Sequence, residues 1–359
     1  MRKGEIGAPI SERASGLLRL LVQEHVRTGR PVGSRRLSKM HPDGLSSATI
    51  RNEVADLEEL GYVTQPHASA GRQPTTLGYR YYVDSMSETA GLSDQDIEKI
   101  RKGLEQETDL DALMDKTSKL LSSLSNNVGF VLVPPLSMTV LKHIEFIKIS
   151  RQRILVILVA PTGFVQHRLI ELEGQLEQVD LDQAGRYLVH NFEGRTLMEI
   201  RGELIRLMSQ DKALYDRLLR KVIVLCAAGL IEDPPNEDDE GAVYVGGTAR
   251  LIQMPEIKDV ERMIKLFQTF EEKSRMVKLV SRCVHLDQPG PTVTIGLENH
   301  LPDMHDFTLV SSPYVYHEGT SGSLGIIGPN RMEYDKVISL VDYVANLFTR
   351  LLNENKPTE

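Results

Sequence analysis

Residues 46–83 read SSATIRNEVADLEELGYVTQPHASAGRQPTTLGYRYYV, and this stretch decides the fold of the N-terminal part of the chain. One face of its first half is apolar, because apolar residues recur at helical spacing: Ile50, Val54, Leu57 and Leu60. Ser46 or Ser47 can accept a hydrogen bond from the unpaired amides of the first turn, and Gly61 ends the helix. The stretch therefore begins with an amphipathic helix.

A hairpin with a basic tip follows this helix directly. Its strand, tip loop and return strand are expected at residues 62–65, 66–72 and 73–76. Small residues separate His67, Ser69 and Arg72 in the loop, so its backbone can approach a phosphate or a minor groove closely.

Two further helices are expected upstream. Apolar positions between residues 14 and 26 predict a first amphipathic helix that stops near Gly29, and a short second helix covers residues 34–40. Residues 41–44 form the turn into the third helix. Three helices followed by a hairpin are the order of a winged helix-turn-helix, and the first hypothesis is a protein that reads duplex DNA.

The third helix and the hairpin carry side chains suited to DNA. The candidate DNA-binding residues are Ser34, Arg35, Arg36, Ser46, Ser47, Thr49, Arg51, Asn52, His67, Ser69 and Arg72. Arg pairs with guanine and Asn with adenine in the major groove, so Arg51 and Asn52 are expected to read bases. Residues 34–36 and Arg72 are expected to contact backbone or minor groove. A winged helix can also dock proteins, and a polar helix face can simply be solvated, so these alternatives stay open.

Charge is distributed unevenly along the chain. Residues 1–84 contain 12 Lys and Arg and 9 Asp and Glu, a net charge of +3, within a chain whose net charge is −8. A weakly basic N-terminal part joined to an acidic remainder predicts that DNA contact is confined to one end. Such a module alone would bind weakly, and dimerisation would raise its effective concentration at a two-part site.

Length and composition narrow the class of protein. With 359 residues the chain is expected to fold into two or three domains. Its longest apolar run, residues 154–160, is far too short to span a membrane, so we expect a cytoplasmic protein without a membrane anchor. Cys226 and Cys283 lie in apolar helical surroundings, which indicates core thiols and not a disulfide or a metal site.

The rest of the chain alternates between helical and strand patterns. We expect a helix at 93–124, strands at 128–133, 144–149, 154–159 and 164–169, helical structure at 181–230, an acidic loop at 232–241, a short strand at 243–245, a helix at 260–283, strands at 292–297, 307–316 and 323–327, and a last helix from Asp335. Strands thus lie on both sides of a helical block. This order predicts an α+β multidomain chain in which one α/β domain is interrupted by an inserted, mainly helical domain.

Other constellations were weighed as sites and favour structural roles. The glycines at 319, 322, 325 and 328 resemble a phosphate-binding loop, but no Lys-Ser or Lys-Thr follows them. His300, Asp303, His305 and Asp306 lack a second cluster of metal ligands. No spacing of nucleophile, base or paired carboxylates supports a reaction. We therefore expect no cofactor, no metal and no enzymatic activity.

Three stretches together resemble one known family. They are residues 46–83, the strand 144–147 with Arg151 and Arg153, and the tail 323–334 followed by 340–343. In these stretches the chain is similar to the heat-inducible transcription repressor HrcA family of bacteria. The similarity runs from about Glu12 to Leu352.

The resemblance implies a dimeric repressor with three domains. These would be a winged helix at 1–84, a GAF-like domain at 128–180 and 276–359, and an inserted dimerising domain at 181–275. A linker and helix at 85–127 would lead into the GAF-like domain. It further implies that the homodimer binds an inverted-repeat operator called CIRCE upstream of chaperone operons. The GroE chaperonin would keep the repressor active until heat occupies it with unfolded clients.

The sequence leaves two alternative functions open. The GAF-like domain could bind a small molecule against its central sheet and switch the dimer between two DNA affinities. The chain could instead be a chaperone-docking or scaffolding protein that makes no contact with DNA. A copurifying ligand would favour the first alternative, and indifference of the pure dimer to duplexes would favour the second.

Overall fold

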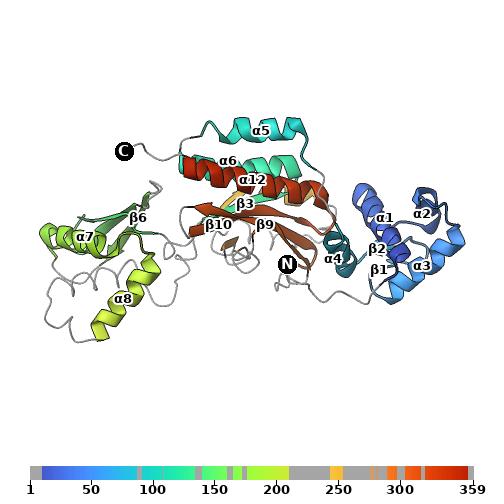
Figure 1. Cartoon of the computed structure of the whole chain (residues 1–359), viewed down its shortest axis with the longest axis horizontal. Coiled ribbons are helices and arrows are strands. Elements are labelled where there is room, and N and C mark those ends of the chain that lie inside the picture. Colours follow the sequence, from blue (N-terminus) through green and yellow to red (C-terminus); the bar gives the residue numbers. More distant parts are fainter. Residues whose placement is uncertain are drawn as a thin grey trace.

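The computed structural model describes residues 10–86, 91–107, 109–133, 140–159, 165–171, 176–209, 243–253, 276–277, 280, 289–296, 304–316 and 320–354. Expectations that lie outside these residues concern Cys226, Cys283, the acidic loop at 232–241 and most of the helix at 260–283. Within the described part of the chain, no helix is long and apolar enough to cross a membrane. The described elements form three groups along the long axis of the molecule (Figure 1).

The N-terminal group, here called the head, combines helices with a small antiparallel sheet. Its elements are α1 (Glu12–Thr28), α2 (Ser34–Met40), α3 (Ser47–Glu59), β1 (Val63–Thr64), β2 (Gln73–Pro74) and α4 (Thr76–Asp84). Three helices and a hairpin therefore follow one another in the expected order. The return strand is shorter than expected, because the Thr75 hydroxyl accepts a hydrogen bond from the Gly78 amide at 3.2 Å and caps α4.

The central group is built on a five-stranded antiparallel sheet. The strand order is β7-β3-β10-β9-β8, helices α6 and α12 cover one face, and α5 packs on α6 (Figure 1). The elements are α5 (Asp94–Leu104), α6 (Leu110–Ser125), β3 (Val128–Leu132), β7 (Val243–Gly246), the 3₁₀ helix η4 (Thr248–Gln253), β8 (Thr292–Ile295), β9 (Phe307–Tyr316), β10 (Thr320–Pro329) and α12 (Tyr334–Glu354). The single helix expected at 93–124 is two helices, because Asp109 caps a new one by accepting from the Ala112 amide at 2.7 Å.

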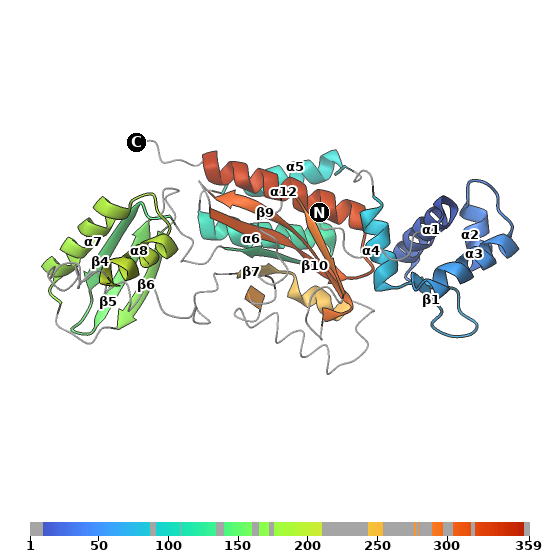
Figure 2. The ribbon, with the colours of Figure 1, turned by 60° about the horizontal axis from the view of Figure 1, so that its bottom comes forward.

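The third group has a sheet of its own in the order β4-β5-β6 (Figure 2). Its elements are β4 (His143–Lys148), β5 (Arg153–Val159), β6 (Val165–Glu171), α7 (Gln178–Phe192) and α8 (Leu197–Ser209). We expected these strands to belong to the α/β domain at 128–180 and the insertion at 181–275 to be mainly helical. The strand pairing differs from this expectation.

The reason is that the three strands form a hydrophobic core with the two helices that follow them in the chain. Among the described residues they pair only with one another, and their inward side chains pack with those of α7 and α8 in a separate apolar core. Alternate residues of β5 are buried, as the period of a half-covered sheet requires. The strands β4, β5 and β6 therefore pack with α7 and α8 and do not pair with β3.

The head is joined to the central group by a shared core. One cluster of buried apolar residues runs from Ala14 in α1 to Leu352 in α12. The Tyr334 ring lies 6.1 Å from the Tyr79 ring and 6.4 Å from the Tyr82 ring, both in α4. Polar contacts add to this core, because Arg331 Nη1 donates to the Val26 carbonyl at 3.1 Å. These contacts attach the head to the central group.

Gly78→Ala is expected to destabilise the head. A Cβ at this position would lie 2.2 Å from the Tyr62 carbonyl oxygen, so α4 would have to move away from the chain that enters β1. Overpacking of this kind costs about 1–3 kcal/mol of unfolding free energy. Urea denaturation of the purified variant measures the loss.

The matched control is Gly16→Ala in α1. A Cβ there would meet nothing within 4 Å, so the variant should gain about 0.5–1 kcal/mol from helix propensity. Equal stability of the two variants would contradict the close packing of α4 on Tyr62.

Candidate nucleic-acid interface

The third helix presents its polar face to solvent. Ile50, Val54 and Leu57 are buried on the inner side of α3, while Ser47, Arg51 and Asn52 are exposed on the outer side of its first turns. Arg51 takes part in no ion pair among the described residues. Its guanidinium is thus available to a base edge or a phosphate.

Ser46 and Thr49 are engaged within the helix itself. Ser46 is the N-cap of α3, and its hydroxyl accepts a hydrogen bond from the Thr49 amide at 3.1 Å. The hydroxyl groups of the two residues also lie 2.9 Å apart. Both were expected to contact DNA, and the structure gives Ser46 a local role in fixing where the helix starts.

The hairpin loop beside α3 is held by its own hydrogen bonds. The side-chain amide nitrogen Nε2 of Gln65 donates hydrogen bonds to the backbone carbonyls of Ala68 and Ala70, each at 2.9 Å. These bonds hold the loop closed. His67 and Ser69 are exposed at its tip. The structure thus places these two expected DNA-binding residues on the surface.

The base of the hairpin is tied to the connection between α1 and α2. Val32 and Arg72 exchange two backbone hydrogen bonds, at 2.7 and 2.9 Å. A Cβ at residue 71 would lie 2.4 Å from the Val32 carbonyl carbon, so Gly71 permits this close approach. The start of α2, with half-buried Ser34 and exposed Arg35, is therefore held close to the hairpin.

Several arginines of the head are held by carboxylates. Arg72 Nε donates to Glu58 Oε2 at 2.8 Å and links the hairpin to α3. Arg13 pairs with Glu53, which links α1 to α3. These glutamates were not predicted from the sequence, because the partners lie 14 and 40 residues apart and no local spacing marks them.

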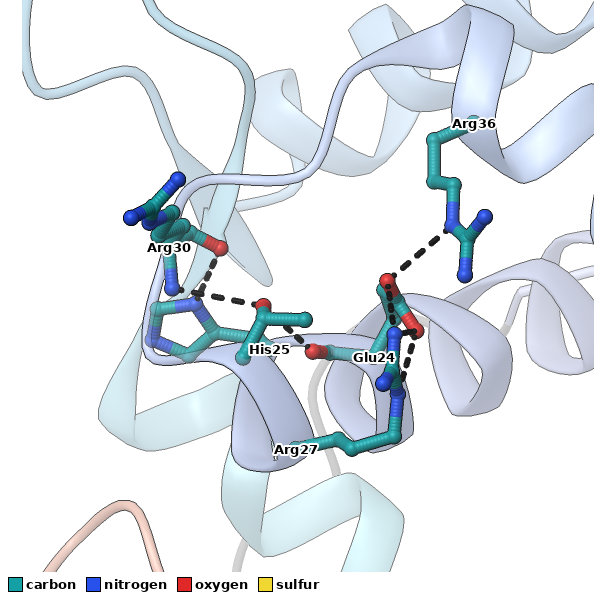
Figure 3. A network of polar contacts seen from close by, with 6 residues as sticks. Glu24, His25, Arg27, Arg30 and Arg36 are labelled. Carbon is teal, nitrogen blue, oxygen red and sulfur yellow. Dashed lines mark hydrogen bonds and ion pairs between the residues drawn. The ribbon is translucent and has the colours of Figure 1, made fainter.

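A further carboxylate joins α1 to α2. Arg36 Nε donates to Glu24 Oε1 at 3.1 Å, and Arg27 binds the same carboxylate (Figure 3). Arg36 was expected to contact DNA, and Glu24 and Arg27 were not singled out. The spacing of Glu24 and Arg27, three residues apart on a helix, was the one sequence signal of this cluster.

A cavity lies where the head meets the central group. Its volume is about 490 Å³, and its walls come from α1, α4, the start of α5 and the start of α12. Tyr82 and Asp335 face each other there, with the hydroxyl and carboxylate oxygens 3.5 Å apart. Burial raises the pKa of Asp335 above its ordinary value, against the lowering effect of the hydrogen bond from Tyr82. The cavity is not on the face of the central sheet where a ligand was expected.

The glycine run at 319–328 and the possible metal ligands at 300–306 lie partly in a strand or a turn and partly outside the described residues. Gly322, Gly325 and Gly328 lie within β10, and position 319 is outside the described residues. His300 and Asp303 are outside them too. No group of three possible metal ligands occurs in the described part of the chain.

Comparisons with known proteins decide the family. The sequence model of the HrcA protein C terminal domain matches residues 111–338. The heat-inducible transcription repressor HrcA of Geobacter sulfurreducens is 42% identical over 344 residues, which are 96% of this chain and 98% of that protein. The chain belongs to the HrcA family. The resemblance noted in the sequence is thereby confirmed.

Other similar proteins agree with this HrcA-family assignment. The heat-inducible transcription repressor HrcA of Syntrophobacter fumaroxidans is 38% identical over 96% of this chain and 98% of that protein. A solved structure described as a hypothetical protein at 2.2 Å resolution covers 96% of this chain and 99% of its own, with a TM-score of 0.57 and 20% identity. That similarity shows a shared fold.

Ser46→Ala is expected to lower the unfolding free energy of the head by about 0.5–2 kcal/mol, because α3 loses its N-cap. The control is Ser47→Ala, which leaves the cap in place and should change stability little. Thermal unfolding followed by circular dichroism compares the two. A Ser46 variant as stable as the Ser47 variant would show that the cap contributes nothing.

Proposed function

We propose that this HrcA-family chain is a repressor that binds duplex DNA as a homodimer and keeps heat-inducible genes silent. The observation that carries the proposal is the exposed polar end of α3, with Ser47, Arg51 and Asn52, beside a hairpin held by its own hydrogen bonds. Its relatives bear the name of heat-inducible transcription repressors, which supports negative regulation of transcription. The activity proposed is binding and not catalysis.

In the proposed complex, the elements of each head contact different parts of the duplex. Ser47, Arg51 and Asn52 enter the major groove, because their short or fork-shaped polar groups match base edges. Arg35, Arg36 and Arg72 contact backbone phosphates, and the hairpin tip lies against the backbone or the minor groove. A dimer bound in this way blocks polymerase at the promoter.

The operator in this proposal is the inverted repeat CIRCE upstream of chaperone operons. The GroE chaperonin keeps the repressor active, and its occupation by heat-unfolded proteins releases the genes. The repressor acts in the cytoplasm and lies on the nucleoid when it is bound to DNA. These details follow from the family resemblance, and the two-fold symmetry of such an operator agrees with a dimer of weakly basic heads.

Arg51→Ala is expected to weaken operator binding by about 1–3 kcal/mol and to relax the preference for the operator over other sequences, because the guanidinium reads a base. Fluorescence anisotropy with a labelled inverted-repeat duplex and a scrambled duplex measures both effects, with and without chaperonin. Arg151→Ala, which removes an exposed arginine of the third group, is the control. An equal loss on both duplexes would mean that Arg51 contacts phosphate. No preference by the intact wild-type protein would reject the operator assignment.

The dimer contact is proposed on the uncovered face of the β4-β5-β6 sheet. One face packs on α7 and α8, while the other exposes Ile149, Val165 and Leu169 at 56%, 53% and 50% of their surface. Leu155 of β5 lies between Ile147 and Leu169 in register, so these three residues form an apolar patch across the sheet. In the adjacent row of the same face, exposed Glu145 and His167 flank Ile157. Apolar side chains exposed together on one face of a sheet are a frequent feature of protein–protein contacts.

A second copy of this chain is the occupant we propose for that patch. An isologous contact puts the same face of two copies together, and it brings the two heads into the two-fold arrangement that an inverted repeat requires. The inserted domain was expected to dimerise through helical residues 181–275. The proposed contact instead uses the strands before them.

Leu169→Glu is expected to convert the dimer to a monomer and to weaken operator binding about 100-fold or more, because two linked heads bind far more tightly than one. Sedimentation velocity and anisotropy measure the two changes. Val179→Glu is the control, since Val179 is an equally apolar residue of α7 that is 62% exposed on another surface. A folded Leu169→Glu protein that stays dimeric would place the contact elsewhere.

The cavity at the junction of head and central group favours a second candidate function, a repressor that responds to a small molecule. Its volume of about 490 Å³ suits such a ligand, and its walls come from both parts. A ligand there would bind one orientation of the head better than another and so change DNA affinity. A metabolite that raises the melting temperature and shifts operator binding together would favour this candidate.

A further inference from the structure

Glu24 is the centre of a polar cluster in the head. Glu24 lies in α1 and is only 5% exposed, yet it binds two guanidinium groups from two helices (Figure 3). Arg27 Nη2 lies 2.8 Å from Oε1 and 3.0 Å from Oε2, and Arg27 Nε lies 3.1 Å from Oε2. Arg36 Nε lies 3.1 Å from Oε1. A single carboxylate therefore places both arginines.

The backbone around this cluster is also held in place. The Thr28 hydroxyl donates to the Glu24 carbonyl at 2.7 Å, and Nδ1 of buried His25 lies 3.0 Å from the Arg30 carbonyl oxygen (Figure 3). The next residues pair with the hairpin through Val32 and Arg72. Arg27 and Arg36 thus project from two helices whose connection is fixed.

The cluster keeps a net positive charge that faces solvent. The two guanidinium groups carry two positive charges against one negative charge, and the side chains of Arg27 and Arg36 are 63% and 53% exposed. The described contacts occupy Nε and Nη2 of Arg27 and only Nε of Arg36. The other N–H groups of the two guanidinium groups make no hydrogen bond to the described residues, so they can donate to an anion or to water.

The Glu24 carboxylate remains ionised while it holds the two arginines. Hydrogen bonds from Arg27, and then from Arg36, hold the pKa of Glu24 below its ordinary value against the effect of its burial. A charged acceptor of this kind fixes a guanidinium more firmly than a neutral one. The two arginines are thus already held in positions from which they can bind one further anion.

We propose that Arg27 and Arg36 together form a binding site for a backbone phosphate of duplex DNA, and that Glu24 is the positioning residue that holds them. This inference rests on the proposed DNA-binding function and extends it, because Arg27 was not among the residues expected to bind DNA. Arg27 also lines the cavity at the junction with the central group. Arg36 lies in the first turn of α2, the helix that crosses the backbone in a helix-turn-helix complex. The competing interpretation is a solvated ion-pair cluster that affects stability alone.

The substitution Glu24→Gln separates the two interpretations by the sign of its effect. It raises the charge of each head by one, so electrostatic attraction alone would strengthen binding to any duplex. If Glu24 positions the arginines, the variant binds more weakly despite its added charge. Glu12→Gln, in the exposed first turn of the same helix, makes the same charge change away from the cluster and is the control.

The experiment measures operator affinity of the full-length protein by anisotropy at several salt concentrations. Arg27→Ala and Arg36→Ala should each weaken binding about fivefold or more on the operator and the scrambled duplex alike, because phosphates carry no sequence information. Each should also make the slope of log K against log salt shallower by about 0.9 for every phosphate that the variant no longer neutralises. Glu24→Gln should weaken binding in the wild-type background, and when both arginines are already alanine it should change binding only as much as Glu12→Gln does, through its added charge.

Two results would overturn the proposal while the wild-type protein still binds its operator. One is a Glu24→Gln protein that binds as tightly as Glu12→Gln, and the other is an unchanged salt slope in Arg27→Ala. If Glu24→Gln does not fold, the two arginine variants decide, since their side chains are largely exposed. A wild-type protein that ignores duplexes would instead reject the underlying DNA-binding function.

Discussion

The position of the head depends on the apolar core that it shares with the central group. Tyr334, at the start of α12, packs against Tyr79 and Tyr82 of α4, and buried residues continue from there into both parts. Burial of these apolar side chains is the main favourable contribution to the free energy that keeps the head on the central group. Arg331 adds a directional polar contact, because its guanidinium donates a hydrogen bond to the Val26 carbonyl. The head is consequently held as part of a larger body and not as a module on a tether.

This attachment matters because the two proposed contact surfaces lie far apart. Figures 1 and 2 place the head at one end of the molecule and the β4-β5-β6 sheet at the other, with the five-stranded sheet between them. A dimer formed through the small sheet would fix the separation of two heads through the whole length of each chain. A change at the junction of head and central group would then alter that separation, and the cavity at this junction lies where such a change would act.

Much of the head could be predicted from local sequence, and the organisation of its charges could not. Helices and hairpin follow from the spacing of apolar residues and from caps such as Ser46. The exposed positions of Arg51 and Asn52 follow from the same periodicity. The partners of Arg36 and Arg72 do not, since Glu24 and Glu58 reach them only after the helices have packed. The small sheet was assigned to the wrong neighbours for a similar reason, because alternation identifies strands but not their pairing.

By itself the sequence determined the family, the order of elements in the head and which side of α3 remains polar, because these depend on residue type and short-range spacing. Tertiary structure alone decided that β4, β5 and β6 form a separate sheet with an uncovered apolar face. It also decided that Glu24 holds two arginines from different helices. The physical reason is that strand pairing and buried ion pairs are set by which surfaces meet in space, and distant segments meet only when the chain folds.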